Sequence, residues 1–101
     1  MLAHQLERLR AAGIRLVPLG EAGTHVLCER EGFAALVVRG EEALGPAGSP
    51  GLLTEQGFAV LVWQENQAFF VTKKHRLPAT EEQLRRLRGF AADLERALGE
   101  T

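Results

Sequence analysis

Hydrophobic residues fill two runs, 58–63 and 68–71, on either side of the polar segment Gln64-Glu65-Asn66-Gln67. This pattern predicts a β-hairpin with two apolar faces, because a hairpin with one wet face alternates apolar and polar residues. A two-residue loop at Glu65-Asn66 pairs Val62 with Phe69. A three-residue loop with Asn66 in the left-handed region is the alternative. The two-residue register gives one face with Phe58, Val60, Val62, Phe69 and Val71, and another with Ala59, Leu61, Trp63, Ala68 and Phe70.

A second hairpin is predicted from 24–30 and 33–39 around Glu31-Gly32, since Gly supplies the positive φ of a tight turn. This register pairs Val26 with Val37 and Leu27 with Leu36, and both faces are again mostly apolar. Residues 14–19 predict a strand before it, and Pro18 is easiest to place on an edge strand. A turn is expected at 20–23.

Two helices are expected at the ends of the chain. Residues 2–12 carry leucines at helical spacing and are followed by Gly13, with Gln5 on the polar face. The better marked helix follows Thr80, which forms a capping box with Gln83 and precedes a leucine stripe that Gly99 ends.

Residues 40–51 are irregular and rich in Gly, Pro and Ala, and Ser49-Pro50 as an N-cap and first turn, with Gly57 as a C-cap, predicts a short helix or a loop over 50–56. The expected order is helix, three-strand meander, short helix or loop, β-hairpin and long helix. The fold class is therefore α+β, with an antiparallel sheet of about five strands in a single domain over residues 1–101.

Charge is balanced over the whole chain but uneven along it. The net charge of −1 argues against a general nucleic-acid binder. Residues 20–65 hold seven glutamates against two arginines, whereas 73–88 hold six cations against two glutamates. Ten arginines against two lysines indicate a GC-rich, thermophilic source. One cysteine and no long apolar run indicate a soluble cytoplasmic protein without a membrane segment.

No catalytic, metal or cofactor site is expected, because the sequence does not place several polar or charged residues at the spacing that such a site requires. The single aspartate, Asp93, is expected on the solvent side of the last helix, so a carboxylate cation site lacks ligands. Cys28 and His25 are three apart on one strand and point to opposite faces, and Cys28 is expected to be buried. The chain is therefore not predicted to be an enzyme.

A basic cluster follows the central hairpin. It comprises Lys73, Lys74, His75 and Arg76, and Arg85 and Arg86 follow on the last helix. One interpretation is a solvated strand end that keeps an apolar hairpin from aggregating. The alternative and more specific interpretation is a basic patch that binds an acidic protein partner. The other functional class, a nucleic-acid-associated protein or small enzyme, also depends on the cations of 73–88.

The ending FFVTKKHRLPATEEQLRRLRGFAADLERAL resembles the end of type III secretion chaperone-like domains, a group that includes the YbjN-like bacterial proteins. The shared pattern is a last apolar strand, a basic or polar loop, and a helix with a leucine stripe and a central Phe. The segment 40–57 departs from it, since those proteins have a fuller helix there. The resemblance implies a non-enzymatic binding protein or a chaperone-like homodimer, and it carries over no binding residue.

Self-association is expected because the predicted hairpins have more apolar faces than the predicted helices can cover. Both hairpins are apolar on two sides, and two helices cover only one side well. If the helices share a face, the other presents either Leu61, Trp63 and Phe70 or Val60, Val62 and Phe69, and a homodimer buries it. If the helices divide between the faces, the protein is a monomer.

Overall fold

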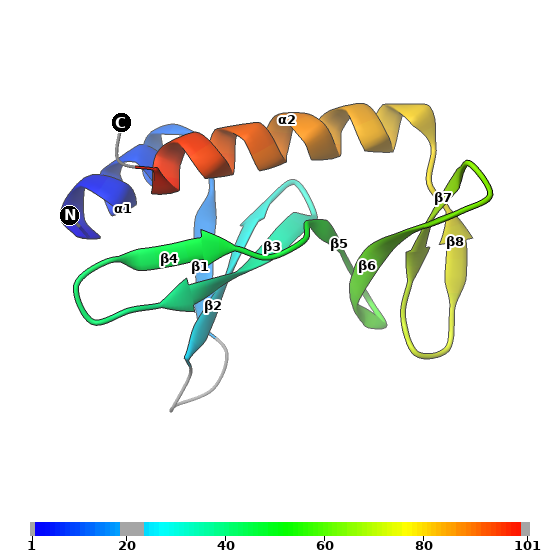
Figure 1. Cartoon of the computed structure of the whole chain (residues 1–101), viewed down its shortest axis with the longest axis horizontal. Coiled ribbons are helices and arrows are strands. Elements are labelled where there is room, and N and C mark those ends of the chain that lie inside the picture. The colour runs from blue at the N-terminus through cyan, green and yellow to red at the C-terminus, as the bar shows by residue number, and fades with distance from the viewer. Residues whose placement is uncertain (1, 19–23, 100–101) are drawn as a thin grey trace.

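The computed structural model of the chain describes residues 2–18 and 24–99 (Figure 1). Two helices flank a run of strands. In chain order the elements are α1 (Leu2–Ala11), β1 (Arg15–Pro18), β2 (His25–Arg30), β3 (Phe33–Arg39), β4 (Leu44–Ala47), β5 (Gly51–Thr54), β6 (Gly57–Gln64), β7 (Gln67–Val71), β8 (Arg76–Pro78) and α2 (Glu81–Leu98).

The strands form one antiparallel sheet in the order β1-β2-β3-β5-β6-β7-β8, and β4 pairs with β3 beside this path. The α+β class and the antiparallel sheet are confirmed. The expected number of about five strands is wrong, because the sheet has eight. Pro18 lies on the edge strand β1, as predicted, and the expected turn at 20–23 lies outside the described residues.

Both predicted hairpins have the predicted register. Val62 pairs with Phe69 across β6 and β7, and Val26 pairs with Val37 across β2 and β3. Glu65 and Asn66 have φ values of 50° and 71°, which confirms the two-residue loop over the three-residue alternative. The capping box of Thr80 and Gln83 at the start of α2 is also confirmed.

The missed strands are the short ones. The segment 50–56 is a strand and turn, not a helix: Leu52 pairs with Ala59, and Leu53 pairs with Phe58. The hydroxyl of Thr54 donates to Gly57 O at 2.8 Å and closes the turn between β5 and β6. Strands of three or four residues are stabilised by their partners more than by local propensity, so the sequence pattern alone does not reveal them.

Both helices cover the same face of the sheet, and Figure 1 shows α2 running along the molecule above the strands. The core lies between these two layers. Alternate positions of β2 and β3 face the helices, which supply Leu9 from α1 and a stripe from α2. The buried cluster is Leu9, Ile14, Val26, Cys28, Phe33, Ala35, Val37, Leu44, Leu87, Phe90, Leu94 and Ala97.

Polar side chains tie α1 to the rest of the fold. Gln5 was expected on the polar face of α1 but is only 6% exposed. Its amide donates to Leu44 O at 3.0 Å and to Leu98 O at 2.9 Å, and its oxygen accepts from Leu44 N at 2.7 Å. Arg8 donates to Ala97 O at 2.9 Å. These bonds satisfy backbone groups of β4 and of the end of α2.

Asp93 is also less exposed than expected. Its carboxylate accepts from Arg30 of β2 at 2.9 Å, and Arg30 donates to Ala12 O at 2.9 Å as well. The guanidinium lies 5.8 Å from the ring centre of Phe90, within cation–π range. Arg30 therefore joins β2 to both helices.

Candidate interaction surfaces

The face of the sheet opposite the helices carries a row of apolar side chains. Val60 pairs with Val71 and Gly51, so these positions share a side, and their neighbours Leu61 and Phe70 point the other way. Val38 is 41% exposed and Val60 is 40% exposed. We call this surface the open face, and its side chains are Leu36, Val38, Leu53, Phe58, Val60, Val62, Phe69 and Val71.

Close packing at Gly51 holds the middle of the open face together. A Cβ placed on Gly51 would lie 3.0 Å from Cζ of Phe58 and 2.2 Å from Ala59 O. The phenyl ring of Phe58 therefore lies across the glycine, where a larger residue would displace it. The β3, β5 and β6 strands are linked here, since Gly51 pairs with both Ala34 and Val60.

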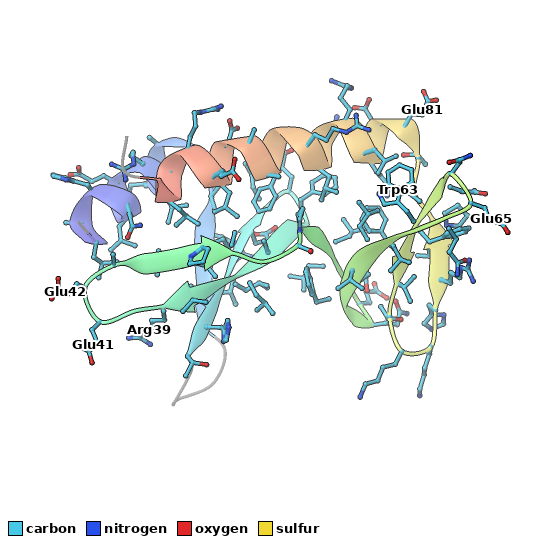
Figure 2. All side chains as sticks on the ribbon, in the orientation of Figure 1. Arg39, Glu41, Glu42, Trp63, Glu65 and Glu81 are labelled. Carbon is cyan, nitrogen blue, oxygen red and sulfur yellow. The ribbon has the colours of Figure 1, made fainter. Side chains whose placement is uncertain are left out.

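Opposite charges lie at the two ends of the sheet. Glu41 and Glu42 are exposed in the turn between β3 and β4, close to Arg39, and Figure 2 shows all three at one end of the molecule. Lys73 and Lys74 are exposed in the turn between β7 and β8, near the other end (Figure 1). Arg76 follows that turn, and its guanidinium carbon lies 4.2 Å from the ring centre of Phe69 on the open face.

A groove of about 600 Å³ lies on the helix side, between the β6–β7 hairpin and the first turns of α2. Trp63 is the most exposed large apolar residue of the described chain, at 56%, and its cross-strand neighbour is the small Ala68. Figure 2 shows its ring beneath the start of α2. Leu84 adds apolar wall, and Arg85 and Arg88 line the helix side of the groove.

The basic residues singled out by the sequence do not form one patch. Lys73, Lys74 and His75 lie in the β7–β8 turn, at the end of the hairpin away from α2 (Figure 1). Arg85 and Arg86 lie on α2, and both bind the carboxylate of Glu82, the latter at 2.8 Å. Arg85, then Arg86, holds the pKa of Glu82 below its ordinary value. The structure thus divides the cluster into an unpaired turn and a paired helix segment, within the described residues.

The predicted self-association face of Leu61, Trp63 and Phe70 is not exposed as a whole. Phe70 is 1% exposed, and Leu61 packs against the core beneath the helices. Their side chains face α2 because they alternate with the open face, and only Trp63 is exposed. The set on the side away from the helices is the other one, in which Val60 is exposed and Val62 and Phe69 are half-buried.

Cys28 is fully buried, and burial raises the pKa of its thiol to about 11. The thiolate that a nucleophile or metal ligand requires is therefore disfavoured. His25 lies on the opposite face from Cys28, as predicted, and it is exposed. Within residues 2–18 and 24–99, no three His, Cys, Asp or Glu side chains are grouped to hold a metal ion.

Three sets of surface features were missed in the sequence. Leu36, Val38 and Leu53 belong to the open face, but their exposure depends on where both helices dock. The acidic turn at Glu41 and Glu42 was seen only as part of an acidic half of the chain. The Trp63 groove depends on the overhang of α2, for which the sequence carries no signal.

Comparison with known proteins gives no match, whether to a family model, a curated protein or a solved structure. Neither of the described helices is both long and apolar enough to cross a bilayer. A functional proposal for this chain accordingly depends on the surfaces described above.

Proposed function

We propose that this chain is a small cytoplasmic binding protein of adaptor or chaperone-like type, without catalysis, whose working unit is a homodimer. The observation that carries the proposal is the open face. Both helices lie on the other side of the sheet, and on the open face Val38 and Val60 are exposed while Leu36, Val62 and Phe69 are only half-buried.

A second copy is the simplest cover for this surface. Monomeric proteins rarely expose a contiguous apolar patch larger than a few hundred Å², since burial is worth roughly 25 cal/mol per Å². In a twofold dimer each open face packs on the other, and the same residues contribute from both chains. The open face extends over β3, β5, β6 and β7, and an extended apolar surface suits a protein contact better than a small ligand.

A face-to-face dimer leaves the helix sides outward. Both copies then display the Trp63 groove, with its indole ring, apolar wall and two arginines. Exposed Trp and Arg side chains are the types enriched at energetically important protein contacts. This groove is our candidate for the contact with the bound protein. The nucleic-acid and small-enzyme alternative is less well supported, because the cations of 73–88 are divided and Glu82 pairs with two of them.

The test is the mass of the protein in solution. For the unmodified chain at micromolar concentration, gel filtration coupled to light scattering is expected to give twice the 11.0 kDa of one chain. Val60→Glu places a charge in the open face and is expected to give a mass near 11.0 kDa.

The matched control is Leu77→Glu, at a residue that is 52% exposed but on the helix side, next to Phe70. This variant is expected to remain a dimer, and circular dichroism checks that both variants are folded. A mass of one chain for the unmodified protein, unchanged on dilution, contradicts the proposal.

A further inference from the structure

The two ends of the open face differ in charge. At one end the β3–β4 turn carries Glu41 and Glu42, and at the other the β7–β8 turn carries Lys73 and Lys74. All four side chains are exposed. None of them forms a hydrogen bond or an ion pair with another described residue.

Neighbouring charges reduce this contrast without removing it. Arg39 lies beside the acidic turn, so its two glutamates keep a net negative charge (Figure 2). At the basic turn, Gln56 lines the same hollow of about 490 Å³ as Lys73 and Lys74, which places its neighbour Glu55 nearby. Arg76 adds a third cation on this side. The basic end therefore stays positive.

Only two twofold arrangements place one open face on another with the long axes aligned. If the axis runs along the molecule, each end meets its own copy, and Glu41 and Glu42 face identical glutamates. If the axis crosses the long direction, the copies run in opposite directions, and each acidic turn meets a basic turn. Like charges at a contact cost affinity, whereas opposite charges favour it.

We propose that the homodimer is antiparallel, with Glu41 and Glu42 of each copy beside Lys73 and Lys74 of the other. The acidic partner of the basic turn is then a second copy of this chain. This inference rests on the proposed homodimer and adds its orientation. The charge pairs lie at the rim of an apolar contact, where they select the arrangement while the open face supplies the buried area.

Charge reversal tests the orientation. One double variant combines Glu41→Lys and Glu42→Lys, and the other combines Lys73→Glu and Lys74→Glu. In the antiparallel dimer each double variant turns both end contacts repulsive, and we expect the dimer Kd from sedimentation equilibrium to rise roughly tenfold to hundredfold. In the parallel arrangement both ends already carry like charges, so neither variant changes the Kd.

The quadruple variant is the matched control. It exchanges the charges of the two turns, so the antiparallel dimer regains attraction at both ends and its Kd returns to near that of the unmodified chain. A parallel dimer shows no such rescue. Unchanged circular dichroism spectra confirm that the variants fold, and 0.5 M salt is expected to reduce the differences between them.

The outcomes separate the two proposals. A monomeric unmodified chain overturns the homodimer itself. A dimer whose Kd is unaffected by both double variants overturns the antiparallel orientation and leaves the homodimer standing. A loss in the double variants that the quadruple variant does not restore also overturns the orientation.

Discussion

Gly51 shows how one residue fixes the middle of the sheet. A side chain there meets the carbonyl oxygen of Ala59 at 2.2 Å, and a backbone atom has little room to move. We expect Gly51→Ala to lower the free energy of unfolding by about 1–3 kcal/mol, the usual cost of overpacking. Urea unfolding at fixed protein concentration measures this change.

The control for Gly51 is Gly89→Ala. Gly89 is exposed in the middle of α2, with no atom within 4 Å of an added Cβ. Alanine is the better helix former, so the free energy of unfolding is expected to rise by about 0.5–1 kcal/mol. A Gly51→Ala protein as stable as the unmodified chain contradicts the packing described at Phe58.

The contacts of Glu29 allow a prediction of how the free energy of unfolding changes at low pH. This buried carboxylate binds Arg15 and accepts from Gly32 N at 2.7 Å, and Arg15 first, with Gly32, holds its pKa below the ordinary value. A lowered folded pKa stabilises the fold above the unfolded pKa of about 4.3, and this contribution is lost as the pH falls through the folded value. Glu29→Gln keeps the shape of the side chain but removes the charge.

We therefore expect the unmodified protein to exceed Glu29→Gln in free energy of unfolding at pH 7. The difference should shrink as the pH falls below the unfolded pKa of about 4.3, because the unfolded chain takes up a proton before the native carboxylate does. Chemical unfolding from pH 7 to pH 3 measures it. A difference that is the same at pH 7 and pH 3 means that the ionised carboxylate is not the cause.

Prediction from sequence succeeded for residues whose role depends on strand alternation. Cys28 is buried, as expected, and His25 lies on the opposite face, as their spacing of three indicated. It failed for Gln5 and Asp93, which were assigned to solvent from helix position alone. Both are held by groups distant in the chain, Leu44 and Arg30, and a helical pattern contains no information about such partners.

At the scale of elements, the hairpins were predictable because their turns and registers are local. Glu31 and Gly32 both have positive φ, so a two-residue loop sets which residues of β2 and β3 meet. Strands β4, β5 and β8 lacked such signals. Each is at most four residues long, and β5 pairs with β3 across the β4 segment. Ser49-Pro50 therefore suggested a helix start, because no local signal marked the strand that follows.

The attachment of α1 depends on Gln5. Removing its amide leaves Leu44 N, Leu44 O and Leu98 O without this partner. We expect Gln5→Ala to lower the free energy of unfolding by about 1–3 kcal/mol, the cost of unsatisfied buried polar groups. Hydrogen exchange at Leu44 N is expected to be faster as well.

Glu7→Ala is the control, since Glu7 is exposed on the same helix and makes no hydrogen bond with another described residue. Its effect should stay within about 0.5 kcal/mol. Equal effects of the two substitutions would show that helix propensity, and not the Gln5 contacts, determines the loss.

At the scale of the whole molecule, the sequence indicated that the helices leave one side of the sheet uncovered, but it did not indicate which side. The sequence allowed two faces of the β6–β7 hairpin, and the choice depends on where α2 docks. The helix lies on the side of Leu61 and Phe70, because Leu87, Phe90 and Leu94 pack there with the core of β2 and β3. Val60, Val62 and Phe69 are thus left on the side that we assign to the second copy.

The most direct test of this assignment detects contacts between two chains. A sample mixing chains with ¹³C-labelled Val and Leu methyl groups and unlabelled chains is suited to isotope-filtered NOE spectroscopy, which records only pairs of protons on different molecules. The account predicts intermolecular NOEs from the methyl groups of Val38, Val60 and Val62. An absence of intermolecular NOEs, or NOEs confined to Leu77 and Leu84 on the helix side, would contradict it.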